Sequence, residues 1–211
     1  MIPVRPLDAV VFISGSGSTL QNLYDCARQG ACAINIKGVL SSKPGVLGLE
    51  RARAVNLPVQ VVNRKDYMDS RAFSQEVFRV VNALKPELIV LAGFTSLLTL
   101  PERYIGKTLN VHPALLPAFG GKGMYGIHVH EAVLKAGEKE SGCTVHFVDN
   151  EYDHGPVILQ KRVPVLAGDT PQKLMARVQL VEREAYPEAI NMLADGRVRY
   201  EKSAAVFNKA K

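Results

Sequence analysis

The sequence has no tryptophan and only three cysteines in 211 residues. Cys26, Cys32 and Cys143 are scattered and form no Cys-x-x-Cys pair, so neither a disulfide framework nor a zinc site is indicated. We expect these cysteines to be buried as small apolar side chains.

Long apolar runs are also missing. None reaches the length of a membrane-spanning helix, and residues 1–6 lack the basic and then apolar layout of a signal peptide. We therefore expect a cytoplasmic protein with no membrane partner.

The chain is moderately basic, with 26 Lys and Arg against 20 Asp and Glu and a net charge of +6. This balance suits anionic partners, either small phosphates and carboxylates or nucleic acid. The basic residues are spread along the chain, and no aromatic residues alternate with a basic stripe, so we expect no nucleic-acid partner. The length and the 47% hydrophobic content suit a single compact unit.

Short apolar runs alternate with segments of helical periodicity in the first half of the chain. Strands are expected at 9–13, 34–40, 59–62 and 88–92. Helices are expected after Ser18 or Thr19 as the N-cap, over 45–55, and after Asp69 or Ser70 as the N-cap. Such alternation is typical of a parallel sheet with right-handed crossovers. We predict an α/β fold with a mostly parallel, doubly wound, Rossmann-like sheet flanked by helices.

The second half of the chain is expected to add strands and one long helix. Residues 141–149 alternate like a strand with one covered face, and 157–159 continue as another strand. A helix should start at Thr170, bend at Pro187 and end at Gly196. The tail that follows Glu201 is expected to be loosely ordered.

A glycine-rich turn, Ser14 to Ser18, follows the first strand directly. Glycines let the backbone approach a ligand, and the first N–H groups and the dipole of the next helix favour negative charge. The turn has neither the Gly-Lys-Ser/Thr of a Walker A loop nor a full dinucleotide fingerprint. The sequence therefore predicts an anion site, with a tight turn that binds nothing as the alternative.

Asn110 and His112 lie two residues apart in an apolar strand that Pro113 ends. Because side chains alternate along a strand, both point to one face, at the end of a strand where α/β sheets usually hold their ligands. The alternative is that the two side chains only satisfy loop carbonyls.

Asp153, in a polar turn at 150–155, could reach the same place. A carboxylate beside an imidazole favours the charged ring and fixes its orientation. An amide and an imidazolium together can stabilise a developing oxyanion. Since no activated Ser or Cys accompanies them, direct attack by a substrate nucleophile is indicated.

Residues 118–126 are glycine-rich and lack periodicity, and we expect a mobile loop over the site. His128 and His130 follow this loop with a spacing that could suit a metal. No third ligand is found at a suitable offset, so the start of a helix over 129–135 is the favoured interpretation.

The polar motifs resemble those of the folate-dependent formyltransferases. The likeness lies in Asn110-Val-His112-Pro-Ala-Leu-Leu-Pro117 and Asp153-His-Gly-Pro156, and continues in Ser14–Gln21, Leu91–Phe94 and Arg177–Gln179. It covers nearly the whole chain. The glycine-rich loop and the proline after the histidine favour the branch of this family that serves purine synthesis.

The resemblance implies the formyltransferase fold and a transfer reaction. The formyl group of 10-formyltetrahydrofolate, the co-substrate, would pass to the amine of glycinamide ribonucleotide without a metal. Asn110 would polarise the formyl oxygen, His112 would donate a proton to the tetrahedral intermediate or the leaving nitrogen, and Asp153 would keep His112 protonated. One domain, 1–211, would comprise a phosphate-binding half, 1–98, and a folate-binding and catalytic half, 99–211.

Ligand-binding positions also follow from the resemblance. The ribonucleotide would contact Gly17, Ser18, Thr19 and Glu182, and the folate would contact Arg71, Thr95, Ser96, Leu97, Leu98, Asn110 and Tyr152. For Glu182, a solvated helix face is the alternative. The partners are thus small molecules, and a homodimer is left open.

The chain departs from the family pattern at three places. Thr19 and Ser96 stand where many members carry Asn and Arg, and the loop at 120–127 is longer than in several relatives. These differences bear on how anions, ribose and folate would be held.

Rival functions of two kinds remain from the sequence, one within the same chemistry and one non-catalytic. A methionyl-tRNA formyltransferase would be expected to carry an extra C-terminal RNA-binding domain, and a formyltetrahydrofolate hydrolase an N-terminal regulatory domain; neither suits 211 residues. A non-catalytic module that binds a phosphate ligand would tolerate loss of Asn110, His112 or Asp153, and all three are present.

Overall fold

The computed structural model describes residues 5–201 and 203–208. The strands are β1 (Leu7–Ile13), β2 (Ile34–Ser41), β3 (Val59–Val61), β4 (Leu88–Leu91), β5 (Thr108–His112), β6 (Glu140–Phe147), β7 (Val157–Pro164), β8 (Val198–Glu201) and β9 (Ala204–Phe207). The helices are α1 (Ser18–Arg28), α2 (Leu47–Ala54), α3 (Ser70–Leu84), α4 (Ile127–Ala136) and α5 (Pro171–Ala194), with short 3-10 turns at Arg64–Asp66 and Glu102–Tyr104.

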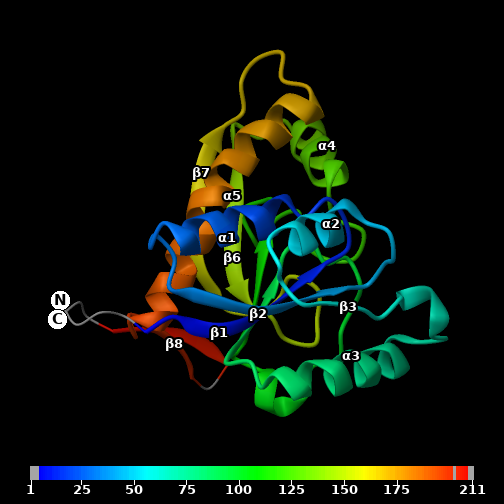
Figure 1. Cartoon of the computed structure of the whole chain (residues 1–211). Coiled ribbons are helices and arrows are strands. Elements are labelled where there is room, and N and C mark those ends of the chain that lie inside the picture. Colours follow the sequence, from blue (N-terminus) through cyan, green and yellow to red (C-terminus); the bar gives the residue numbers. More distant parts are fainter. Residues whose placement is uncertain (1–4, 202, 209–211) are drawn as a thin grey trace.

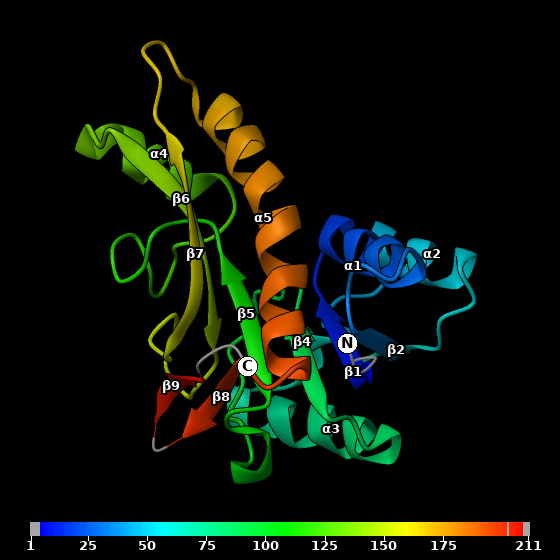
Figure 2. The same ribbon diagram turned by 90° about the vertical axis from the view of Figure 1, so that its left-hand side faces the viewer.

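Seven strands form one sheet in the order β3-β2-β1-β4-β5-β6-β7. The first five are parallel, whereas β6 runs antiparallel to both β5 and β7. Helices α1 and α2 cover one face and α3 the other, and α5 runs along the molecule between α1 and the β6–β7 pair (Figures 1 and 2). The predicted α/β class and the mostly parallel, doubly wound sheet are confirmed.

The alternation along β1 divides the core between the two faces. Val11 and Ile13 belong to the core under α1, α2 and α5, whereas Val10 and Phe12 belong to the core under α3. Phe73 on α3 has no exposed area, and burial of such a side chain stabilises the fold by roughly 1.5–3 kcal/mol. A continuous apolar run such as residues 9–13 has apolar side chains on both faces, so it forms a strand that is buried on both faces.

Strand β6 is buried on both faces, so the prediction of one covered face is wrong. Residues 141–147 are all buried. The segment after β5 covers the second face, where the Thr144 hydroxyl donates to Ala114 O at 2.7 Å and accepts Leu116 N–H at 3.0 Å. Strand β7 also extends beyond the predicted 157–159.

The tail forms a hairpin. Strands β8 and β9 pair in antiparallel register. The prediction of a loosely ordered tail after Glu201 is therefore wrong for Ala204–Phe207. Residues 209–211 lie outside the described residues.

The long helix α5 is a single helix that continues through Pro187. Proline cannot donate to the carbonyl one turn earlier, and that carbonyl, of Arg183, instead accepts from Asn22 Nδ2 of α1 at 2.9 Å. The buried Tyr186 hydroxyl lies 3.0 Å from Leu91 O and 2.9 Å from Leu109 O. Helix α5 is thereby attached to α1, β4 and β5, the elements that surround the site.

The three thiols are free; Cys32 and Cys143 are buried and Cys26 is half-buried. Burial raises the pKa of both Cys32 and Cys143 to about 12, as expected for inert apolar side chains. Among the described residues, no helix is long and apolar enough to cross a membrane.

Candidate active site

A cavity of about 620 Å³ opens at the carboxyl ends of β1, β4 and β5. Its size is within the ordinary range for small-molecule sites. The glycine-rich turn after β1, the segment after β4, the end of β5, the 121–126 loop, the 151–153 turn and α5 all contribute to its wall. The carboxyl ends of these three parallel strands therefore meet at one edge of the sheet.

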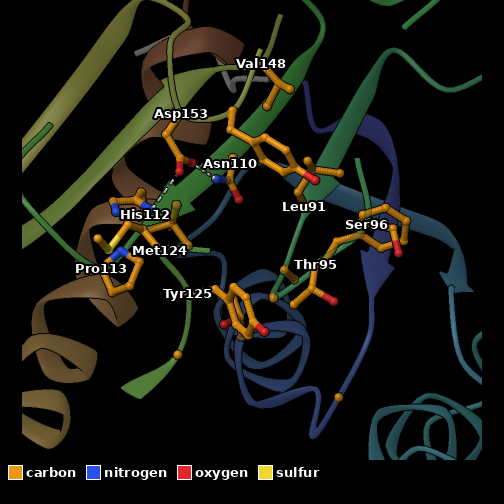
Figure 3. Close-up of a pocket in the computed structure, with 18 of the residues that line it drawn as sticks. Leu91, Thr95, Ser96, Asn110, His112, Pro113, Met124, Tyr125, Val148 and Asp153 are labelled. Atoms are coloured by element: carbon orange, nitrogen blue, oxygen red, sulfur yellow. Dashed lines mark hydrogen bonds and ion pairs between the residues drawn. The ribbon is translucent and has the colours of Figure 1, made fainter. Parts of the chain in front are cut away.

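Asn110, His112 and Asp153 lie together at this edge (Figure 3). Asp153 Oδ2 is 3.4 Å from His112 Nδ1, and Asp153 Oδ1 is 3.4 Å from Asn110 Nδ2. Asp153 adopts the left-handed conformation, with φ of 53°, in the turn between β6 and β7. The three polar groups therefore converge, although they come from two separate parts of the chain.

Asp153 is held as a carboxylate. Burial alone would raise its pKa, but hydrogen bonds to His112 and to the Gly121 N–H, together with the charge of His112, keep the pKa below its usual value. The Gly121 N–H donates to Oδ2 at 2.9 Å. The glycine-rich loop is thus part of the site.

His112 is buried, and both of its ring nitrogens face acceptors. Nδ1 faces Asp153, and Nε2 lies 2.7 Å from Phe119 O. A carbonyl oxygen only accepts, so Nε2 carries a hydrogen, and the doubly protonated ring satisfies both contacts. This arrangement suits a proton donor.

At the other end of the cavity, Gly17 precedes α1 with φ of 72°, and no side chain caps the helix. The prediction of Ser18 or Thr19 as the cap is therefore wrong. The N-cap position is Gly17, which has no side chain to cap the helix, and a Cβ there would lie 2.5 Å from Gly48 Cα. The first turn of α1 is left free to bind an anion through its backbone N–H groups.

Ser14 links this end of the cavity to the segment after β4. Its buried hydroxyl lies 2.6 Å from the Ser42 hydroxyl and accepts the Thr95 N–H at 3.1 Å. The glycine-rich turn and the Thr95 segment are therefore held in fixed relation.

Glu182, on α5, is half-buried and lines the cavity. It does not lie on a solvated face of the helix. Burial raises its pKa to about 7, against the opposing effect of the His112 charge. Its carboxylate therefore exchanges protons near neutral pH.

Most residues expected at the folate line the cavity, namely Thr95, Ser96, Leu97, Leu98, Asn110 and Tyr152. Arg71 does not. It is exposed in the first turn of α3 and is absent from the cavity wall. The expectation for Arg71 therefore receives no support from its position.

Two buried histidines of the wall, His130 and His146, were not predicted from the sequence to line the substrate site. Burial lowers the pKa of His130 to about 4, and the charge of His112 makes a smaller contribution in the same direction. His146 faces Asn110 across the β5–β6 pair. Had the pairing of β6 with β5 been known, the alternation of side chains along β6 would have indicated that His146 lies on the same face as Asn110. His128 is exposed and pairs with Glu131, and no metal-binding group of His, Cys, Asp or Glu occurs in the described part of the chain.

Comparison with known proteins agrees with this geometry. The formyl transferase family model matches residues 7–190. The chain belongs to this family, which confirms the resemblance seen in the motifs.

Individual relatives show which members of the family this chain is similar to. The phosphoribosylglycinamide formyltransferase of Escherichia coli is 38% identical over 201 residues, 94% of this chain and 92% of that protein. A crystal structure of glycinamide ribonucleotide transformylase 1 from Symbiobacterium toebii matches with a TM-score of 0.88 at 36% identity, covering 96% of this chain and 94% of that one.

A third relative is much longer. The trifunctional purine biosynthetic protein adenosine-3 of Drosophila melanogaster is 42% identical over 200 residues, 93% of this chain. The chain spans only 14% of that protein's length.

Proposed function

We propose that the chain transfers the formyl group of 10-formyltetrahydrofolate to the amine of glycinamide ribonucleotide, a step of de novo purine biosynthesis. The observation that carries the proposal is one continuous cavity with two chemically different ends. One end presents the free first turn of α1, and the other presents Asn110, His112 and Asp153. The names of the Escherichia coli and Symbiobacterium relatives agree with it.

The ribonucleotide fits the first of these ends. The backbone at Gly17, Ser18 and Thr19 offers N–H groups to a phosphate, which the dipole of α1 favours. Glu182, with its pKa of about 7, would accept a hydrogen bond from the glycinamide amine. The departure at Thr19 leaves this binding intact, because it uses backbone groups.

The folate fits the mixed wall formed by residues 95–98 and Tyr152. Apolar Leu97 and Leu98 suit a ring system, and Thr95 and Ser96 offer polar groups at its edge. Bound 10-formyltetrahydrofolate would supply the formyl carbon. Arg71 is left out of this surface because of its position on α3.

The catalytic residues then have distinct tasks. His112 donates a proton where negative charge develops on the formyl oxygen, or to the leaving nitrogen. Asp153, held ionised by His112 and by the Gly121 N–H, orients the ring. No enzyme nucleophile is required, since the substrate amine attacks directly.

In this proposal, residues 1–98 form the phosphate-binding half and 99–211 the folate-binding and catalytic half of a single domain. Glu182 is a ribonucleotide contact from the second half. The partners are the two small molecules and no metal takes part. The cytoplasmic location stays a prediction from the sequence, and a homodimer is left open.

A spectrophotometric assay of folate product, with and without glycinamide ribonucleotide, tests the proposal. Turnover that requires the ribonucleotide is expected. Folate release without an acceptor would replace the proposal by a hydrolase, and binding of both ligands without turnover would replace it by a non-catalytic module.

A further inference from the structure

Lys122 is the only lysine or arginine among the described residues of the cavity wall. The wall also carries four carboxylate side chains, those of Asp149, Glu151, Asp153 and Glu182. Of the imidazole rings there, the charged ring of His112 already faces Asp153 at 3.4 Å. Lys122 is therefore the one side chain of the wall that can offset these carboxylates when an anionic ligand enters.

Lys122 lies in a tight turn that is attached to the reaction end of the cavity. Gly121 O accepts the Met124 N–H at 3.1 Å, which closes the turn, and the Gly121 N–H donates to Asp153 Oδ2 at 2.9 Å. Nothing lies within 4 Å of a Cβ position at Gly121 or Gly123, the residues on either side of Lys122. The turn therefore determines where the Lys122 backbone lies and leaves open space around it.

The ammonium group of Lys122 is not held by the protein. The side chain is exposed, and in residues 5–201 and 203–208 it makes no ion pair and no hydrogen bond. Burial tends to raise the pKa of both Asp153 and Glu182, and in each case the opposing positive charge comes from histidine and not from Lys122. These two carboxylates thus leave the charge of Lys122 free to act on a ligand.

Both substrates of the proposed reaction are anions. The ribonucleotide carries a phosphate, and the glutamate end of 10-formyltetrahydrofolate carries carboxylates. The first turn of α1 offers a phosphate backbone N–H groups and a dipole that is equivalent to roughly half an elementary charge. The folate wall, residues 95–98 and Tyr152, contains no cation. Neither anion therefore meets a full positive charge in this wall unless Lys122 provides it.

We propose that Lys122 is a substrate-binding residue whose ammonium group pairs with an anionic oxygen group of the substrates, the ribonucleotide phosphate or a folate carboxylate. The inference rests on the proposed function for the identity of these anions. The ion pair brings the 121–124 turn against the bound substrate. Because the same turn donates to Asp153, anion binding at Lys122 also restrains the loop that holds this carboxylate beside His112.

Calorimetric titration tests the inference without any turnover. The ligands are glycinamide ribonucleotide and tetrahydrofolate, each compared with an analogue that lacks the anion, glycinamide riboside and tetrahydropteroate. In Lys122→Gln we expect the affinity for one of the two anionic ligands to fall ~10-fold or more, since a charge-assisted contact is lost, and the affinity for its analogue to stay unchanged. Whichever ligand is weakened identifies the anion.

Charge is separated from side-chain shape by two further variants. Lys122→Arg keeps the positive charge and should retain most of the affinity. Lys135→Gln is the matched control, because Lys135 is exposed in the last turn of α4, outside the cavity wall, and its loss should change neither affinity. Added salt should weaken the pairing ligand more in the wild type than in Lys122→Gln.

Arg183 of α5 provides the sharpest comparison. It borders a smaller groove beside Ser18 and Thr19 and is absent from the cavity wall. A loss of ribonucleotide affinity in Arg183→Gln, with none for either ligand in Lys122→Gln, would place the cation on α5 and overturn the inference.

The remaining outcomes also decide. Unchanged affinity for both anionic ligands in Lys122→Gln, or an equal loss for the analogue without the anion, would overturn the inference. Thermal melting checks that the variant is folded, and no change is expected because the side chain is exposed. Binding of both ligands that depends on Lys122, without any formyl transfer in the wild type, would contradict the proposed function alone.

Discussion

The two ends of the cavity are built in opposite ways. The anion end is a run of backbone, Gly15 to Thr19, from one strand–turn–helix unit. The reaction end consists of side chains from β5, β6 and the turn between β6 and β7, held by backbone of the 119–121 loop. Substitution should therefore act differently at each: through main-chain geometry at the first end, and through removal of single functional groups at the second.

The largest expected effect is at the reaction end. His112→Ala removes the proposed proton donor and should lower kcat by ~100-fold or more, while the affinity for glycinamide ribonucleotide stays nearly unchanged because the phosphate is proposed to bind at the other end. Steady-state kinetics and calorimetric titration measure the two quantities. An unchanged kcat would exclude His112 from the mechanism, and a parallel loss of affinity would show that the two ends are not separate.

At the anion end, the corresponding change is Gly17→Ala. The new Cβ would lie 2.5 Å from Gly48 Cα in a left-handed conformation, so we expect a loss of about 1–3 kcal/mol in unfolding free energy and a raised KM for the ribonucleotide. Chemical denaturation and kinetics report both. Gly15→Ala is the matched control for stability, since nothing lies within 4 Å of its Cβ position. Equal loss of stability in both variants would contradict the close packing.

Glu182, on the cavity wall, should make the stability of the protein depend on pH. Its folded pKa of about 7 exceeds the ordinary carboxyl value, so the folded protein binds more protons than the unfolded chain between the two values. Its contribution to stability is therefore fully present at low pH and is lost as the pH rises toward 7. Glu182→Gln should flatten this part of the profile of thermal stability against pH. An identical pH profile in the variant would place Glu182 in solvent.

The smallest expected effect is at Ser14, between the two ends. Ser14→Ala leaves the Thr95 N–H without its acceptor, and we expect a loss of about 1 kcal/mol in unfolding free energy with a modest rise in both KM values. Denaturant unfolding and kinetics measure these changes. A change in only one KM would show that Ser14 supports only one of the two ends.

The same contrast explains what could be predicted from the sequence. The anion end is local, so the order of apolar run, glycine-rich turn and helix was sufficient to predict its strand–turn–helix geometry. Strand alternation was likewise sufficient to place Asn110 and His112 on one face, and the polar turn at 150–155 indicated Asp153.

Nonlocal packing accounts for the rest. The approach of Gly48 to Gly17 leaves no room for a side chain at the N-cap of α1, and Ala114 and Leu116 cover the second face of β6. Pairing with β5 brings His146 to Asn110. No local pattern in the sequence records these contacts, so the helix cap, the covered strand and the third imidazole of the site had to be found in the structure.

The most direct measurement follows the formyl carbon itself. The protein is incubated with 10-formyltetrahydrofolate labelled with carbon-13 in the formyl group and with glycinamide ribonucleotide labelled with nitrogen-15 in the amine. We predict a one-bond carbon–nitrogen coupling in the product NMR spectrum, since the amine takes up the formyl group directly. Labelled formate in solution without that coupling would contradict the account.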